Sequence, residues 1–270
     1  MLAALPTRFL VQAADHDGPR APRFDESLIE LATASITTDA AASAGSDGFA
    51  AVWQAEQGLV VPRTYQHHEN FLPACKEFAQ AGWPVTVRQS GGGIVPQGPG
   101  ILNLSIAYGV RGRPLDHSNA AYELICVLIQ NALKEHGIPS RMQAVEGSFC
   151  DGRYNLAVGP ADDSKKVAGT AQVWRRIRNE NAQPEMKERL SDVQVVLVHA
   201  LILAQVDIHA VTRQANRFEL AVGSGRRYDA HRTMSLHHCL AAPVSGSGNF
   251  TETLRRSLLR QLGASASPQR

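Results

Sequence analysis

The chain has 270 residues, of which 44% are hydrophobic and 19% are charged, and its formal net charge at pH 7 is +2. These values are typical of a globular protein that buries one large core. The net charge is too small to indicate nucleic-acid binding, although a local basic patch could meet an acidic carrier protein. No apolar run approaches the length of a membrane span, so we expect no membrane partner.

The four cysteines are widely spaced, at positions 75, 126, 150 and 239, and they form no CxxC pattern. Such spacing does not indicate a disulfide framework, so a reducing compartment is the simplest setting. The first residues lack a basic flank followed by a long apolar core, which is the pattern of a signal peptide. We therefore expect a cytoplasmic location.

Hydrophobic periodicity and turn residues predict the elements in chain order. Residues 1–22 are expected to form a loose arm, with room for one edge strand. Asp25 is a plausible N-cap for the helix that follows. The predicted elements are a helix over 26–34, strands over 49–57 and 59–62, a helix over 71–81, strands over 85–88 and 101–108, a helix over 119–136 capped by Ser118, strands over 154–158, 167–174, 193–203 and 206–208, and helices over 211–221 and 251–262. For residues 49–57 a helix is the alternative.

Three segments are predicted to carry little regular structure. Residues 65–70 form a polar loop, and residues 178–189 are charged without apolar periodicity, which indicates an exposed, mobile insert. Residues 264–270 are expected to be a disordered tail. The predicted organisation is thus an N-terminal arm over 1–22, a main domain over 23–210, a small C-terminal extension of that domain over 211–263, and the tail.

A cysteine and a lysine lie on either side of a predicted hairpin. Cys150 stands in a polar turn bracketed by Gly147 and Gly152, and Lys166 begins the return strand. Strand alternation places Lys165 and Lys166 on opposite faces, so only one of them can point toward Cys150. One interpretation is a thiol nucleophile beside a cation. The other is an inert, half-buried cysteine and a solvated lysine, since most cysteines are structural.

Ser90-Gly91-Gly92-Gly93 directly follows a predicted strand. Consecutive glycines allow a ligand to approach the main chain and let backbone N–H groups converge on it. A flexible turn is the plain alternative. The pattern is neither a Walker loop nor GxGxxG, so it gives no independent argument for a nucleotide.

Two motifs together resemble the signatures of the biotin/lipoate A/B protein ligase superfamily. The first is Arg88-Gln89-Ser90-Gly91-Gly92-Gly93-Ile94-Val95-Pro96 with the following Gly100-Ile101-Leu102-Asn103, and the second is Lys166-Val167-Ala168-Gly169-Thr170-Ala171-Gln172. They occur in the expected order, and the resemblance covers about residues 24–207. It implies an α/β fold, in which a central mixed β-sheet is flanked by helices and followed by a small C-terminal extension.

The resemblance also implies roles for individual residues. Cys150 and Lys166 would be catalytic, as in the cysteine-dependent octanoyl- and lipoyl-transferases. Gly169 would lack a side chain because the acyl chain passes there. The remaining substrate-binding residues would be Arg88, Ser90, Gly91, Gly92, Gly93, Asn103, Thr170, Ala171 and His199. For Arg88 a surface position, and for His199 a structural position in the core, are the alternatives.

The implied activity is acyl transfer in protein lipoylation, without a cofactor. The donor would be an acyl carrier protein or the glycine-cleavage H protein, and the acceptor a lipoyl domain of a 2-oxoacid dehydrogenase complex or the H protein. One alternative is an ATP-dependent lipoate–protein ligase, which would use ATP and Mg²⁺. Such ligases typically carry Phe-His-Asp where Pro96-Gln97-Gly98 stands here, and the stretch after Ala204 is shorter than a typical second domain. The other alternative is a non-catalytic acyl- or carrier-binding protein.

Clustered histidines offer a weaker signal. His231, His237, His238 and Cys239 match no standard zinc spacing, and neither does His67-His68-Glu69. We therefore predict no metal site.

Overall fold

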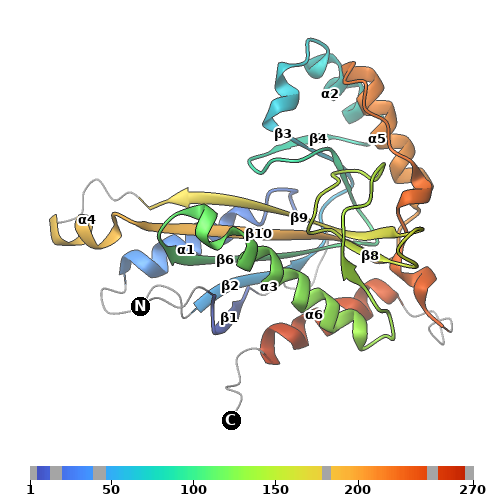
Figure 1. The fold of residues 1–270 in the computed structure, drawn as a ribbon. Coiled ribbons are helices and arrows are strands. Elements are labelled where there is room, and N and C mark those ends of the chain that lie inside the picture. The colour runs from blue at the N-terminus through green and yellow to red at the C-terminus, as the bar shows by residue number, and fades with distance from the viewer. Residues whose placement is uncertain (1–4, 13–19, 39–46, 178–183, 242–248, 265–270) are drawn as a thin grey trace.

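The protein is described by a computed structural model that covers residues 5–12, 20–38, 47–177, 184–241 and 249–264. Two sheets form its framework, a large one of seven strands and a small one of three. In Figure 1 the small sheet and its helices stand above the large sheet. Within the described ranges, no helix has the length and apolar character needed to cross a bilayer.

The large sheet is mixed. Its outermost pair, β1 and β2, runs parallel, and every other neighbouring pair is antiparallel. The strands are, from edge to edge, β1 (Arg8–Val11), β2 (Asp47–Trp53), β6 (Ile101–Arg111), β10 (Val193–Leu203), β9 (Lys165–Arg176), β8 (Leu156–Val158) and β7 (Arg141–Met142).

Helices cover both faces of this sheet (Figure 1). On one face lie α3 (Pro114–Lys134) and α6 (Phe250–Ala264), and on the other lies α1 (Glu26–Thr38). The central strand β10 is apolar except at Gln194 and His199 because both of its faces are buried: Val196 and Val198 face the α3 side, whereas Val195 and Leu197 face the α1 side. The predicted mixed sheet flanked by helices is confirmed.

The small sheet has the order β4 (Val85–Arg88), β3 (Gly58–Pro62) and β5 (Val95–Gln97). Two helices, α2 (Phe71–Gln80) and α5 (Ile208–Val222), pack on it around the buried ring of Phe218. The shorter helical elements of the chain are η1 (Arg63–His67), α4 (Pro184–Leu190), η2 (Ala230–Arg232) and η3 (Leu236–Cys239). This layer therefore brings residues 58–97 together with the much later helix α5.

Most predicted elements exist, and two of them, 85–88 and 193–203, have the predicted bounds. The strand predicted over 206–208 is wrong: the Asp207 side chain accepts a hydrogen bond from the Ala210 N–H (2.9 Å) and caps α5. The helix predicted from 119 begins at Pro114, which suits the first turn because it lacks an N–H. The polar loop predicted over 65–70 begins instead within η1, and Tyr65 is buried there.

The outcome for the predicted segments is mixed. The arm contains the edge strand β1, and part of the predicted insert is the helix α4, whereas residues 178–183 and the tail 265–270 lie outside the described residues. The position predicted for a boundary, between 210 and 211, lies inside α5. The division into a main domain and an extension stays a prediction.

Gly100, at the start of β6, is required by close backbone packing. Its φ is +81°, and an added Cβ would lie 1.9 Å from the Gln205 carbonyl oxygen. We expect Gly100→Ala to lower the free energy of unfolding by about 2–5 kcal/mol, from the combined cost of the left-handed backbone and the overlap. Gly263→Ala is the control, because nothing lies within 4 Å of its added Cβ. Urea denaturation of both variants would test this, and equal stabilities would contradict it.

Candidate active site

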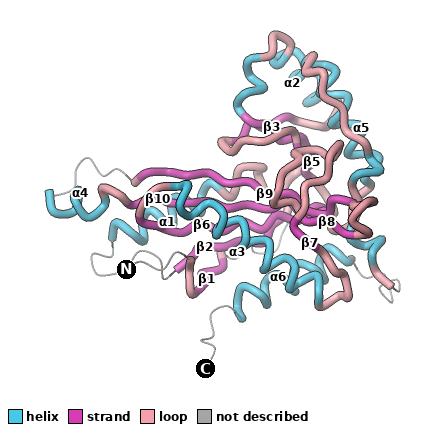
Figure 2. The backbone as a smooth tube through the Cα atoms, in the orientation of Figure 1, coloured by secondary structure: helices cyan, strands magenta, loops and turns pink. Residues whose placement is uncertain are grey.

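Cys150 stands in an irregular stretch of the chain. Residues 143–155 contain no helix or strand (Figure 2), yet side chains fix their path. The Asp151 carboxylate accepts a hydrogen bond from the Val145 N–H (2.8 Å), and the Ser148 hydroxyl donates to the Val145 carbonyl (2.7 Å). Cys150 itself has a φ of +52°, and no other non-glycine residue in the described segments has a positive φ.

A bulge at the β8–β9 edge turns Lys166 toward this loop. Ala157 pairs with Lys166 and Leu156 with Ala168, so β9 has one extra residue, Val167, at this point. Such a bulge changes the strict alternation of side chains and re-aims a residue next to a site. The buried Lys166 ammonium donates to the carbonyls of Phe149 (2.5 Å) and Cys150 (2.9 Å). Lys165 instead pairs with Asp163 (2.7 Å), as strand alternation predicted.

Gly169 makes room for Lys166. A Cβ at this position would lie 2.8 Å from the Lys166 Nζ and 3.0 Å from its Cε. The passage of an acyl chain, which we expected to be the reason for a glycine at position 169, is therefore not needed to explain it, because any side chain there would collide with Lys166. The Gly169 backbone still lines the cavity described below.

Residues 90–93, which we call the glycine loop, lie on the other side of Cys150. An added Cβ on Gly92 would lie 2.5 Å from the Cys150 sulfur, so a side chain at position 92 would collide with the thiol. Arg88 braces the loop, because its Nη2 donates to the carbonyls of Gly91 (2.9 Å) and Gly93 (2.8 Å). The same Nη2 lies 3.9 Å from the sulfur. Arg88 is thus a partly buried member of the site rather than a surface residue.

Electrostatics favour the Cys150 thiolate. Burial alone would raise the pKa of the Cys150 thiol, but the charges of Lys166 and Arg88 and hydrogen bonds from the Gly93 N–H and Arg88 outweigh it, so the pKa lies below its usual value. Burial lowers the pKa of Lys166 to about 8, although the neighbouring Cys150 and Asp151 oppose that shift.

The other three cysteines differ in this respect. Burial raises the pKa of Cys75 and of Cys239, and burial together with Glu123 raises that of Cys126 to about 12. All four cysteines are free. Because the thiolate is the reactive form, Cys150 is the candidate nucleophile.

A cavity with about 750 Å³ of empty space, part of it open to solvent, is lined by Cys150 and Lys166. Its floor is the α1 side of β9 and β10, where the register pairs Gly169 with Leu201, Ala171 with His199 and Val173 with Leu197. The small sheet and the segment before α1 form the walls, through Val60, Val95, Gln97, and residues 22, 23, 25 and 26. This face of the two strands is apolar except at His199, although Thr170 and Gln172 of β9 also line the cavity, so the floor suits an apolar ligand.

His199 is held by polar neighbours at the floor of the cavity. Its Nδ1 lies 2.9 Å from the Ser105 hydroxyl and 3.2 Å from the Asp25 carboxylate. The Trp53 indole N–H donates to the same Ser105 oxygen (3.1 Å). His199 is thus a satisfied polar residue that also faces the cavity, and Asp25, predicted as a helix cap, is its partner.

The structure brings most of the predicted site residues together. Those that line the cavity are Arg88, Ser90, Cys150, Lys166, Gly169, Thr170, Ala171 and His199. Gly92 and Gly93 adjoin Cys150, and Gly91 accepts from Arg88. Asn103 does not line the cavity: it is fully buried and exchanges hydrogen bonds with the Gln97 amide (2.8 and 3.1 Å).

Sequence reasoning missed several lining residues, among them Phe149, Gln97 and Asp25. Gln97 could have been found from the sequence, since it stands where related ligases typically carry Phe-His-Asp. Phe149 and Asp25 could not have been found, because their position depends on how distant segments pack. Among the described residues, no group of three or more His, Cys, Asp or Glu side chains could hold a metal ion.

Comparisons with known proteins agree with this arrangement. A family model described as the lipoyl protein ligase A/B catalytic domain matches residues 28–214. An uncharacterised protein of Cupriavidus necator is 44% identical over 222 residues, covering 81% of this chain and 86% of that protein. An octanoyl-[GcvH]:protein N-octanoyltransferase of Kyrpidia tusciae is 32% identical over 157 residues, covering 58% of this chain and 50% of that enzyme.

Solved structures share the fold. The crystal structure of a lipoate-protein ligase A bound with ATP aligns with a TM-score of 0.60 at 13% identity, covering 97% of this chain and 85% of that one. A bipartite lipoate protein ligase from Thermoplasma acidophilum, solved with its E2 lipoyl domain, aligns with a TM-score of 0.53 at 15% identity, covering 97% and 84%. Fold and sequence together define an enzyme of the biotin/lipoate A/B protein ligase superfamily. Within it, the chain belongs to the lipoyl protein ligase A/B catalytic domain family.

Lys166 should control the ionisation of Cys150. We expect Lys166→Met to raise the pKa of the Cys150 thiol, because burial then acts against fewer positive charges. Alkylation of Cys150 by iodoacetamide at pH 7 should slow by about tenfold or more, and its pH profile should move upward. Lys165→Met is the matched control and should keep the native profile. Equal shifts in the two variants would contradict the assigned orientation of the lysines.

Proposed function

We propose that this protein transfers an octanoyl or lipoyl group from a carrier protein to a lysine of a lipoyl domain, through a thioester on Cys150. One observation carries the proposal: the Cys150 thiol, whose pKa is lowered, lines the same cavity as the largely apolar face of β9 and β10. A thiolate there can attack an acyl group whose chain lies along the floor.

The length of the floor supports a medium-chain acyl group. From Gly169 to Val173 the strand advances four residues, or about 13 Å at the usual rise per residue. Three backbone bonds span about 3.5 Å, so the seven bonds of an extended octanoyl chain span about 8 Å. Such a chain fits with its carbonyl carbon near Cys150 and its methyl end near His199 and Leu197.

In the first half-reaction, the Cys150 thiolate attacks the acyl carbonyl, a C–S bond forms to Cys150, and the bond to the donor breaks. The Lys166 ammonium has three N–H groups, of which two donate to main-chain carbonyls. The third has no hydrogen-bond acceptor among the described residues and can stabilise the developing oxyanion. If the donor is an acyl-lysine amide, the leaving amine needs a proton, which a lysine with a pKa of about 8 can supply.

In the second half-reaction, the amine of the acceptor lysine attacks the acyl-enzyme. The C–N bond forms, the C–S bond breaks, and Cys150 leaves as the thiolate. Lys166, which became neutral when its proton passed to the leaving amine of an amide donor or to the leaving thiolate of a thioester donor, takes up the proton that the acceptor amine loses, which restores the starting state. A lysine that titrates near neutrality serves both directions, whereas an ordinary lysine would remain charged.

The names of the relatives guide the choice of partners. The Kyrpidia tusciae relative is named for an octanoyl-[GcvH] donor, and the Thermoplasma acidophilum ligase was solved with its E2 lipoyl domain. We therefore place octanoylated glycine-cleavage H protein first as donor and lipoyl domains as acceptors. An octanoyl thioester on acyl carrier protein is the second donor.

The acyl-enzyme should be directly observable. The protein mixed with octanoylated H protein or octanoyl carrier protein, and no acceptor, should gain one octanoyl group on Cys150 by intact-mass measurement and peptide mapping. Hydroxylamine or apo lipoyl domain should remove it. Cys150→Ala should form no thioester and lose at least about a thousandfold in transfer rate, as expected for loss of a nucleophile.

Cys126→Ala is the matched control, because that cysteine lies in the core with a raised pKa. It should retain thioester formation. Transfer by Cys150→Ala at the native rate would overturn the thioester route. Binding of octanoyl carrier without any turnover in the native protein would indicate a non-catalytic acyl-binding protein.

Transfer should need no nucleotide. Gln97 stands where ligases typically carry their Phe-His-Asp motif, and its amide is engaged by Asn103. We expect the native protein to modify apo lipoyl domain equally well with and without Mg-ATP when an acylated protein donor is supplied. Mass spectrometry of the lipoyl domain measures this. A strict requirement for Mg-ATP, with free octanoate or lipoate as the better substrate, would instead identify a ligase.

A further inference from the structure

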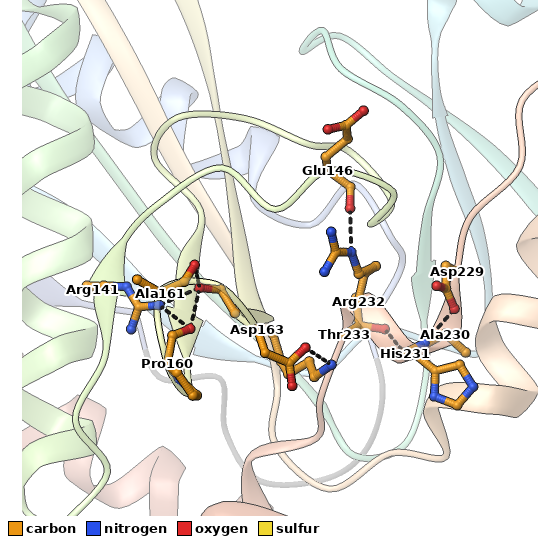
Figure 3. A network of polar contacts seen from close by, with 12 residues as sticks. Arg141, Glu146, Pro160, Ala161, Asp163, Asp229, Ala230, His231, Arg232 and Thr233 are labelled. Atoms are coloured by element: carbon orange, nitrogen blue, oxygen red, sulfur yellow. Dashed lines mark hydrogen bonds and ion pairs between the residues drawn. The ribbon is translucent and has the colours of Figure 1, made fainter.

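A late segment of the chain, residues 228–234, contacts the supports of both Cys150 and Lys166. The Asp229 N–H donates to the Gly147 carbonyl (2.9 Å), and the Arg232 Nε donates to the Glu146 carbonyl (3.1 Å; Figure 3). The Met234 N–H donates to the carbonyl of Lys166 itself (2.9 Å). We call residues 228–234 the C-terminal strap. It follows the part of the chain matched by the family model, which ends at residue 214.

Tyr228, the first residue of the strap, is fixed to α5 at both ends. Its backbone N–H donates to the Asn216 side chain (2.8 Å), and its carbonyl accepts from the same amide (2.9 Å). Its hydroxyl donates to Oε1 of the fully buried Glu219 (2.6 Å). Burial and this hydrogen bond raise the pKa of Tyr228, so the phenol stays a neutral donor.

The other side of Tyr228 faces the active site. An added Cβ on Gly93 would lie 3.4 Å from the Tyr228 hydroxyl and 3.4 Å from the Cys150 nitrogen, so the phenol packs against the glycine loop beside Cys150. Its ring also makes an edge contact with Phe149, with centroids 6.0 Å apart. Gly93 lies against the Cys150 backbone and is among the groups that lower the pKa of the Cys150 thiol, and the Phe149 carbonyl accepts a hydrogen bond from the Lys166 ammonium.

We propose that Tyr228 is a positioning residue, which acts through Gly93 and Phe149 to hold Cys150 where its thiolate is stabilised. Glu219 accepts the hydrogen bond of the Tyr228 hydroxyl on the side away from Cys150. Glu219 thus holds Tyr228, Tyr228 lies against Gly93, and Gly93 lies against Cys150. This inference rests on the proposed role of Cys150 as a nucleophile. It extends the functional unit into a segment that the recognised motifs do not include.

The chain contains a matched control for this proposal. Tyr65 donates to the same Glu219 oxygen at the same distance of 2.6 Å, but its ring packs toward Phe218 and His68, within the small-sheet layer. Tyr65→Phe and Tyr228→Phe therefore each remove one phenol from Glu219. Only Tyr228→Phe also removes a group that lies beside the glycine loop.

The test is the pH profile of iodoacetamide alkylation of Cys150 in the full chain, with no acyl donor and with peptide mapping to identify the site. Tyr228→Phe should slow alkylation at pH 7 at least threefold and move the profile upward, and Tyr65→Phe should keep the native profile. Both should lower the denaturation midpoint by similar amounts. Glu219→Gln, whose amide oxygen still accepts from Tyr228, should stay close to native.

Two outcomes would overturn the proposal: a native alkylation profile in Tyr228→Phe, or equal shifts in the two tyrosine variants, which would indicate a general loss of rigidity. If Tyr228→Phe does not fold, Arg232→Ala tests the strap through its bond to the Glu146 carbonyl, with the same shift expected. A failure of the proposed function is distinguishable, because it appears in the native protein as an absence of octanoyl-Cys150.

Discussion

The site depends on a buried ammonium group. Lys166 is almost wholly enclosed, and its charge is held by two main-chain carbonyls of the loop that carries Cys150. An unpaired charge in such a place would be very costly, so the loop and the lysine must form together. The bulge at Val167 aims the lysine, and the missing side chain of Gly169 gives it room. The two hydrogen bonds that stabilise the Lys166 charge therefore also fix the position of Cys150.

Cys150 and Lys166 could be named as candidate catalytic residues because the two superfamily motifs mark them, whereas local spacing alone also allowed an inert cysteine and a solvated lysine. Cys150 stands in a glycine-bracketed turn, Lys166 begins a run of small residues, and alternation separates it from Lys165. The pattern of apolar residues likewise predicted the bounds of β10 and β4 correctly. Short elements were harder: the 206–208 strand was wrong because a single capping side chain, Asp207, converted that stretch into the start of α5.

What the sequence could not provide is contact between distant segments. The bulge depends on a register between β8 and β9, which no local pattern records. Asn103 belongs to a motif that suggested contact with substrate, yet it is buried and hydrogen-bonds to Gln97, which lines the cavity in its place. Asp25 and His199 lie 174 positions apart and meet only because α1 begins over β10. Tyr228 likewise reaches the glycine loop only after α5 has packed on the small sheet.

The left-handed backbone of Cys150 has a consequence for evolution. A non-glycine residue at a φ of +52° carries about 1–2 kcal/mol of conformational strain, which glycine at the same position would relieve. Position 150 would therefore be occupied by glycine if stability alone were selected. On the mechanism proposed above, the cysteine at this position exchanges part of the small free-energy margin of folding for a nucleophile. Descendants of this fold that no longer need the thiol have a direct stabilising substitution available there, so residue 150 can record whether a lineage has kept the chemistry.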